Sequence, residues 1–183
     1  MKIIEDNQNY TLYENNIRIF KPCVILGFEN IEWGKNIMID HYVTIDARKQ
    51  KVKFGDYIHI PIYSSITGGG GFAMGNFATL SHGVRIVSSS DDFTGWGFGN
   101  PTIPAEFRNI KSAPITIGDF CVIGAESVIL QGVNIAEGAT VGANATITKS
   151  LDAWCVYVGA NKKIGNRDKE GVMATYKKFL ESK

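Results

Sequence analysis

An aliphatic side chain returns every six residues between residues 117 and 147 of this chain, and this period most constrains the fold. Because six is even, successive anchors of an extended chain point to the same side, as do the residues two places before each anchor. The residues in between are mostly small. Short strands of this kind that turn at corners and stack coil on coil form a parallel β-helix. The anchors are Ile117, Ile123, Ile129, Ile135, Val141 and Ile147, and the inward residues before them include Cys121, Ser127, Val133, Ala139 and Ala145.

Insertions in the same frame indicate how many strands make one coil. Extra residues follow every third anchor: three after Ile45, two after Ile66 and twenty-five after Ile86. The frame therefore predicts about five triangular coils, with all insertions leaving one corner. The longest, about residues 88–112, is predicted to be an extruded loop, and long loops in compact repeats usually carry function. The upstream anchors are Trp33, Ile39, Ile45, Phe54, Ile60, Ile66, Met74, Leu80 and Ile86.

The two ends of the chain do not share this frame. Residues 1–22 alternate without it and are expected to cap the first coil of a β-helix over residues 23–158. Residues 159–183 begin with a basic turn. Apolar residues at helical spacing follow over 169–180, which predicts a short amphipathic helix that covers the last coil.

Composition narrows the classes of function. A formal net charge of +1 gives no electrostatic case for nucleic-acid binding. No apolar stretch resembles a signal peptide or a membrane span, so a cytoplasmic protein is expected. The three cysteines are odd in number and widely spaced, which indicates reduced thiols. Cys121 lies in an inward position and is expected to serve packing rather than chemistry.

Residues 114–163 resemble the C-terminal half of the hexapeptide-repeat acyltransferases. This family includes galactoside and xenobiotic acetyltransferases and nucleotide-sugar N-acetyltransferases. The resemblance implies an all-β, left-handed parallel β-helix with one long extruded loop and a short C-terminal helix. It also implies a homotrimer with active sites between subunits, and acetyl-CoA as co-substrate without a required metal.

The resemblance also implies where coenzyme A binds. The family's backbone contacts to the pantetheine arm fall on the small corner residues Gly124, Ala125, Gly142 and Ala143. The family ends its last coil with a small-residue turn and basic residues that meet the phosphates. The matching residues here are Lys162, Lys163 and Arg167, which suit charge-assisted hydrogen bonding. The alternative for these three is a solvated basic tail.

The start of the extruded loop departs from the best-known pattern. Galactoside-type enzymes place a histidine there, but this chain has Asp91 followed by Asp92. An aspartate with a pKa of about 3.9 is a poor general base unless burial raises the pKa. A sugar hydroxyl needs a base as it attacks a thioester, whereas a neutral amine is already nucleophilic. The acidic pair therefore favours an amine acceptor, and the loop resembles the branch that acylates 3-amino or 4-amino deoxysugars linked to nucleotides.

The remaining candidate residues surround this loop. Phe93, Trp96 and Phe98 could stack on a base or a sugar, although they could instead pack the loop against its own prism. Arg108 and Lys111 could meet a pyrophosphate.

Two histidines are candidates to accept the proton. His82 lies at the corner before the loop and is the first choice, and His59 points outward in the coil below. Each could equally be a surface imidazole.

The sequence thus predicts an acetyl-CoA-dependent N-acetyltransferase acting on a nucleotide-linked amino deoxysugar for a bacterial surface polysaccharide. The first alternative is O-acetylation of a sugar hydroxyl. A zinc-dependent carbonic-anhydrase-like β-helix is less favoured. His41 and His82 share a corner slot two coils apart, about 10 Å, too far to share zinc within one chain. A non-catalytic scaffold is the last alternative.

Overall fold

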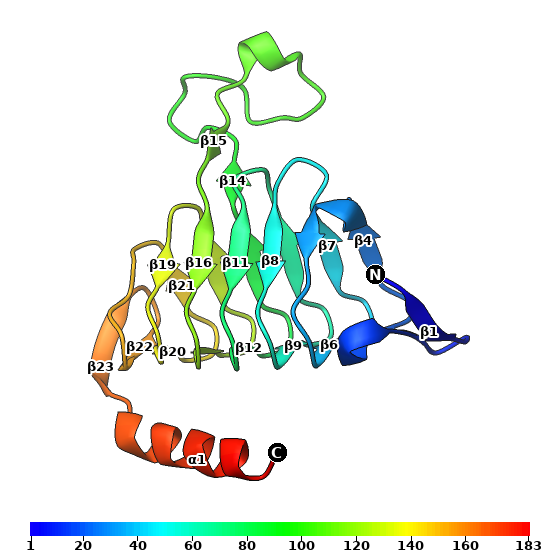
Figure 1. Cartoon of the computed structure of the whole chain (residues 1–183). Coiled ribbons are helices and arrows are strands. Elements are labelled where there is room, and N and C mark those ends of the chain that lie inside the picture. Colours follow the sequence, from blue (N-terminus) through cyan, green and yellow to red (C-terminus); the bar gives the residue numbers. More distant parts are fainter.

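The computed structural model describes residues 1–183 and shows three β-sheets that form the faces of a triangular prism (Figure 1). The fold is a left-handed parallel β-helix, as expected. We call the faces A, B and C, in the order in which the chain visits them. A helix, α1 (Lys169–Glu181), lies outside the prism.

Each face is a ladder of short strands, one from each coil. Face A has the order β1 (Ile3–Asp6), β2 (Tyr10–Tyr13), β3 (Ile17–Phe20), β6 (Ile37–Ile39), β9 (Ile58–Ile60), β12 (Thr79–Leu80), β17 (Val122–Ile123), β20 (Thr140–Val141), β22 (Cys155–Val158) and β23 (Lys162–Asn166). Face B has β4 (Val24–Leu26), β7 (Thr44–Asp46), β10 (Ser65–Thr67), β13 (Arg85–Val87), β18 (Val128–Leu130) and β21 (Thr146–Ile147). Face C has β5 (Ile31–Glu32), β8 (Val52–Phe54), β11 (Phe72–Met74), β16 (Ile115–Ile117) and β19 (Asn134–Ile135).

The six-residue anchors form the core. On face B, for example, Ile66 pairs with Ile86, Ile86 with Ile129, and Ile129 with Ile147, and all four side chains are fully buried. The 33 buried apolar residues form one continuous cluster along the prism. The β-branched anchors suit short strands, because their side chains pack well on a pleated surface.

The prism is longer than the predicted five coils. Face A contains seven parallel strands, β3 to β22, because Ile19 pairs with Ile39 at one end and Tyr157 with Val141 at the other. Residues 17–20, expected to belong to a cap, are therefore the first strand of the prism. The antiparallel pair β1 and β2 precedes this strand.

All three insertions leave the corner between faces B and C, as the frame predicts. They connect β7 to β8, β10 to β11, and β13 to β16. The longest projects from the prism as the extruded loop (Figure 1). Its base is an antiparallel pair, β14 (Ser89–Ser90) with β15 (Lys111–Ser112), and its outer part holds the 3-10 turn Ala105–Phe107.

A buried polar network ties these three insertions together. The Gln50 carboxamide donates to the Asp46 carbonyl at 2.6 Å and accepts from the Gly71 amide at 3.1 Å and the Ser88 hydroxyl at 2.8 Å. The Ser88 hydroxyl in turn accepts from the Gly70 amide at 3.1 Å. Gln50 and Ser88 are both buried. The base of the extruded loop is thus held by the two insertions below it.

Replacing Gln50 with leucine is expected to destabilise the protein by about 1–3 kcal/mol, because the Gly71 amide loses its acceptor in this buried network. Denaturant unfolding measures this difference. Lys49→Leu is the matched control, because Lys49 is exposed on the same insertion. Equal stability of the two variants would contradict a role for the network.

The C-terminal helix does not cover the last coil. It begins at the N-cap Asp168, whose carboxylate accepts from the Gly171 amide at 2.9 Å, and runs back along the corner between faces C and A (Figure 1). Its aromatic residues rest edge-on against rings of that corner. Phe179 contacts Tyr57 and Phe77, and Tyr176 contacts Phe77 and Phe120.

These corner rings form a ladder, which we define as Tyr57, Phe77, Phe120 and Trp154. Tyr57 and Phe77 stack with centroids 4.7 Å apart, and Phe77 and Phe120 stack at 5.4 Å. All four residues have a φ of 55–59°. That left-handed conformation costs a residue with a Cβ about 1–2 kcal/mol, so glycine would fit the turn better. The rings therefore occupy the corner at a cost in backbone free energy. Stacking among the rings and their contacts with α1 offset this cost.

At 13 residues, α1 is too short to span a membrane, and no other helix in the structure is longer.

Candidate active site

Asp91 and Arg108 lie together at the base of the extruded loop. Arg108 donates to Oδ1 of Asp91 from Nη2 at 2.7 Å and from Nε at 3.2 Å. The Arg108 side chain is 15% exposed and the Asp91 side chain is 23% exposed, so the pair is largely shielded from water. Oδ2 of Asp91 has no hydrogen bond within the chain, and it is left as an acceptor for a bound group.

Asp92 has a different environment. Its carboxylate accepts from the Thr94 amide at 2.8 Å, from the Thr94 hydroxyl at 2.5 Å and from the Trp96 amide. These hydrogen bonds, led by the Thr94 hydroxyl, lower the pKa of Asp92 to about 2. Lys111 adds a smaller favourable charge. Asp92 therefore braces the loop, and of the two aspartates only Asp91 keeps an oxygen for a ligand.

The loop aromatics do not pack against their own prism. Phe93 is 91% exposed, Trp96 83% and Phe98 63%. This finding removes the alternative that the rings bury the loop on its own chain. Stacking on a substrate stays a prediction for Phe93 and Trp96, as pyrophosphate contact does for Arg108 and Lys111.

The two candidate histidines lie on the prism and not in the loop. Nε2 of His59 is 3.0 Å from Oδ2 of Asp40, one coil below. His82 is exposed at the corner between faces A and B, where its carbonyl accepts from the Glu126 amide. Within one chain neither imidazole contacts Asp91. Asp40 was not among the predicted residues, because only the register of β6 and β9 places it beside His59.

Ser81 is a second residue that the sequence does not single out. Because Leu80 pairs with Ile123, Ser81 lies beside Gly124 in the next coil, immediately before His82. Its amide donates to the Ile123 carbonyl at 2.8 Å. Its side chain is half-buried on the outer surface of face A, close to the corner predicted to hold pantetheine.

That corner is built from small residues, as predicted, but the packing of the coils also limits the size of the residues that can stand there. A Cβ on Gly124 would lie 2.5 Å from the Ala143 amide nitrogen, and one on Gly142 would lie 2.9 Å from Val158 Cγ1. Close stacking of coils thus demands glycine at position 124, where the contacts are with backbone, whereas at position 142 the closest atom is a side-chain methyl group. The corner still offers Ala125 and Ala143 as a shallow, partly exposed surface that an extended ligand can approach.

The three basic residues after the last coil separate into two groups. Lys162 and Lys163 are exposed on β23, and Lys163 lies 4.0 Å from Asp152. Arg167 instead turns back to the prism and donates to the Phe120 carbonyl at 2.5 Å and the Gly138 carbonyl at 3.0 Å. Phosphate binding stays a prediction for all three, and for Arg167 it would compete with these contacts.

Cys121 is buried, as expected, and its thiol donates to the Ala136 carbonyl at 3.1 Å. Burial raises the pKa of this thiol to about 11, so it stays protonated at neutral pH.

Cys121→Ala is accordingly expected to leave turnover nearly unchanged, with only a modest loss of stability from the smaller side chain. Initial rates and a thermal melt of the same preparation measure both. Complete loss of turnover in the folded variant would contradict a packing role.

No group of three histidine, cysteine, aspartate or glutamate side chains gathers where it could hold a metal ion. His41 stacks on Phe20, with centroids 5.2 Å apart.

Comparison with known proteins agrees with this arrangement. A family model for the hexapeptide repeat of succinyl-transferase matches residues 114–149. The chain is 35% identical to a dTDP-4-amino-4,6-dideoxy-D-glucose acyltransferase of Escherichia coli over 85% of its own length and 81% of that protein. It is 26% identical to WbbJ of Escherichia coli strain K12, a putative lipopolysaccharide biosynthesis O-acetyl transferase, over 90% of the chain and 86% of WbbJ.

A solved structure gives a close match. An aspartate-to-alanine mutant of AntD, an N-acyltransferase from Bacillus cereus, solved with dTDP and coenzyme A, superposes with a TM-score of 0.86 at 34% identity. The match covers 92% of this chain and 89% of AntD. The chain therefore belongs to the hexapeptide-repeat acyltransferases, enzymes that use coenzyme A thioesters.

Proposed function

We propose that this enzyme transfers an acyl group from a coenzyme A thioester to the amino group of a dTDP-linked 4-amino-4,6-dideoxyhexose. The Escherichia coli relative carries that sugar in its name, and AntD has been solved with dTDP-4-amino-4,6-dideoxyglucose and coenzyme A. The observation that carries the proposal is the free Oδ2 of Asp91, whose other oxygen Arg108 holds. A carboxylate fixed in this way can accept a hydrogen bond from an amine and orient it.

The AntD structures add support for Asp91 and for Ser81. They include forms in which one aspartate or one serine is replaced, and these two positions are ten residues apart. Ser81 and Asp91 are the only serine and aspartate of this chain with that separation and order. We propose that both contact the acceptor amine.

In the proposed reaction the amine nitrogen attacks the thioester carbonyl carbon. The carbon–nitrogen bond forms, the carbon–sulfur bond breaks, and the proton released by the amine ends on the departing thiolate. Asp91 orients the amine, and His82, next to Ser81, is the proposed proton carrier, with His59 as the second candidate. Positioning the two reactants supplies much of the acceleration.

For the donor, the corner of Gly124, Ala125, Gly142 and Ala143 is proposed to hold the pantetheine arm. Lys162 and Lys163 are proposed to meet the phosphates, with Arg167 as a third contact. Acetyl-CoA is the first donor to test. A larger acyl group is also reasonable, because AntD has been solved with 3-hydroxybutyryl-CoA.

We further propose that the enzyme acts as a homotrimer with sites between subunits, in the production of a surface polysaccharide. In such a trimer, loop residues of one chain can meet face residues of its neighbour, although the two sets are apart in one chain. The test of the activity is incubation with acetyl-CoA and dTDP-4-amino-4,6-dideoxyglucose, followed by mass spectrometry of the sugar nucleotide. A product heavier by one acetyl group is expected, and no acylated product with either acetyl or 3-hydroxybutyryl donor would overturn the proposal.

O-acylation is the second candidate, because WbbJ is a relative and because the His59 imidazole is paired with Asp40. An imidazole oriented by a carboxylate could act as the base that a hydroxyl acceptor needs. The same incubation with a hydroxyl acceptor decides between the two candidates.

A further inference from the structure

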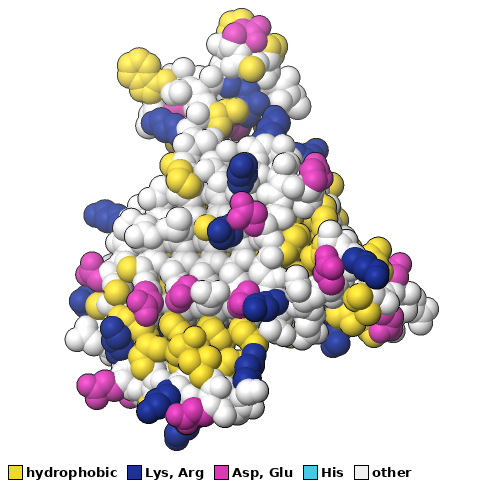
Figure 2. Space-filling model, in the orientation of Figure 1, with side chains coloured by type: hydrophobic (Ala, Val, Ile, Leu, Met, Phe, Trp, Pro, Cys, Tyr) yellow, Lys and Arg dark blue, Asp and Glu magenta, His cyan; other side chains and the backbone are white.

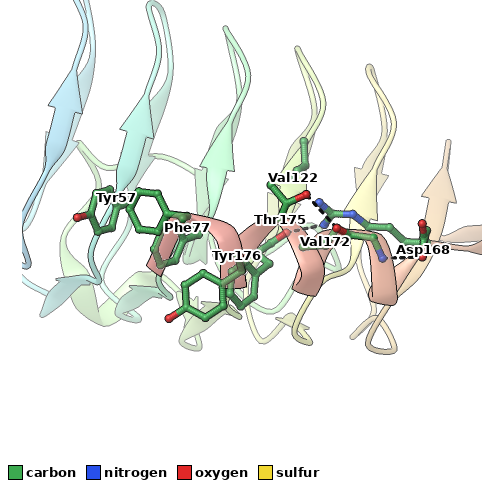
Figure 3. Close-up of a pocket in the computed structure, with 11 residues that line it drawn as sticks. Tyr57, Phe77, Val122, Asp168, Val172, Thr175 and Tyr176 are labelled. Carbon is green, nitrogen blue, oxygen red and sulfur yellow. Dashed lines mark hydrogen bonds between the residues drawn. The ribbon is translucent and has the colours of Figure 1, made fainter. Parts of the chain in front are cut away.

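An apolar groove runs between α1 and the prism. It has a volume of about 730 Å³, and its walls include Phe77, Phe120 and Val122 from the prism and Thr175 and Tyr176 from the helix. Figure 3 shows the helix side chains pointing toward the corner rings, and Figure 2 shows apolar side chains gathered at the same edge of the molecule. The floor is formed by three rings of the aromatic ladder, Tyr57, Phe77 and Phe120, which are held in a disfavoured backbone conformation.

The extruded loop carries the complementary feature. Phe93, Trp96 and Phe98 project from it and are 91%, 83% and 63% exposed. Large exposed apolar surface usually marks an interaction site. The loop leaves the corner between faces B and C, whereas the groove follows the corner between C and A (Figure 1). Face C separates them, so the loop of one chain does not fill its own groove.

Loop and groove lie at the same height along the prism. The loop leaves between β13 and β16, and Phe120, in the floor of the groove, directly follows β16. Phe77 precedes β12 of the coil from which the loop departs. A second copy turned about an axis parallel to the prism, without sliding along it, would therefore bring its loop level with the groove.

We infer that the aromatic tip of the extruded loop of one copy docks in the groove between α1 and face A of the next copy. The inference rests on the proposed trimer. Such a contact joins two different surfaces, and repeated by rotation it closes into a ring. Three aromatic side chains bury about 150–250 Å² each, a large share of the roughly 800 Å² per partner of a standard interface.

This contact would also complete the active site. It holds the loop that carries Asp91 and Arg108 over the face of the neighbour that carries Ser81 and Gly124. The C-terminal helix would then bind the loop of the neighbouring copy.

Hydroxyl-radical footprinting of the assembled protein, without substrate, tests this docking. Wild-type Phe93 and Trp96 should be oxidised several-fold more slowly than in Thr175→Glu, which places a charge in the groove. Ala174→Glu is the matched control on the neighbouring exposed position outside the groove, and it should keep the wild-type protection. Reciprocally, Trp96→Ala should increase the oxidation of Tyr176.

Sedimentation and circular dichroism of the same samples separate docking from folding and from assembly. Loss of protection in folded Thr175→Glu supports the inference, whether or not the trimer dissociates. Rapid oxidation of Trp96 in a wild-type trimer, or protection that persists in Thr175→Glu, overturns it. A monomeric wild type with exposed Trp96 overturns both docking and trimer, whereas the proposed acyl transfer is judged separately by its product.

Discussion

Replacing Asp91 with asparagine is expected to lower kcat/KM for the amine acceptor about a hundred-fold or more, in the range lost when a positioned polar group of an active site is removed. The amide keeps an oxygen for Arg108 but loses the negative charge that orients the amine through Oδ2. Affinity for coenzyme A should not change, because no predicted donor contact involves the loop. Initial rates of thiol release and calorimetric titration with coenzyme A measure the two quantities.

Glu106→Gln is the matched control for this variant. Glu106 is an exposed acid in the 3-10 turn of the same loop and has no hydrogen-bonding partner from its side chain within the chain. It should retain wild-type turnover. Near-normal turnover of folded Asp91→Asn would show that Asp91 only positions Arg108, and the role proposed for Oδ2 would be wrong.

Replacing Phe54 with alanine is expected to cost about 3–5 kcal/mol of unfolding free energy. Phe54 is among the largest fully buried side chains, and its ring contacts Trp33 and Phe72, with centroid separations of 5.3 and 6.2 Å. Backbone hydrogen bonds between β8 and its neighbours β5 and β11 fix the spacing of the coils. The coils therefore cannot move together to fill the cavity that the substitution would leave. Urea or guanidinium unfolding measures the loss.

Lys53→Ala on the same strand is the control for Phe54→Ala. Lys53 points outward and pairs with Glu32 at 3.3 Å on the surface, where an ion pair contributes less than about 1 kcal/mol. A stability change within about 0.5 kcal/mol is expected there. If both variants unfolded at the same denaturant concentration, the inward and outward assignment of face C would be contradicted.

The repeat could be predicted from sequence because its signal is local and regular. Each anchor from Phe54 to Ile147 needs only the six-residue spacing to be placed, and the structure buries them as predicted. The first strand of the prism was missed for a physical reason. Its inward residues Ile17 and Ile19 are buried, but the turn Phe28–Asn30 puts Ile25 and Trp33 eight residues apart, so the six-residue frame counted back from Trp33 does not reach them.

The position of α1 could not be predicted. Tyr176 and Phe179 indicate an apolar face, but their partners Tyr57, Phe77 and Phe120 are 20 and 43 residues apart along the chain. These rings form one surface only when the coils are in register. Glycine positions can suggest a binding site where the fold already requires glycine. Gly124 leaves room for a ligand, but the packing of the next coil also requires a glycine there.

For the site, the sequence leads to the loop and to its acidic pair but does not distinguish the two aspartates. Hydrogen bonds to Thr94 and Trp96 occupy Asp92, and Arg108 leaves one oxygen of Asp91 free. Those differences depend on the folding of the loop. The histidines stay candidates, because within one chain neither of them contacts Asp91.

The most direct test of the account is thiol release from acetyl-CoA with two acceptors in parallel, dTDP-4-amino-4,6-dideoxyglucose and the same sugar nucleotide with a hydroxyl at that position. The account predicts rapid release with the amine and release at the background rate with the hydroxyl. Faster turnover of the hydroxyl acceptor would contradict the central claim and assign the enzyme to O-acylation.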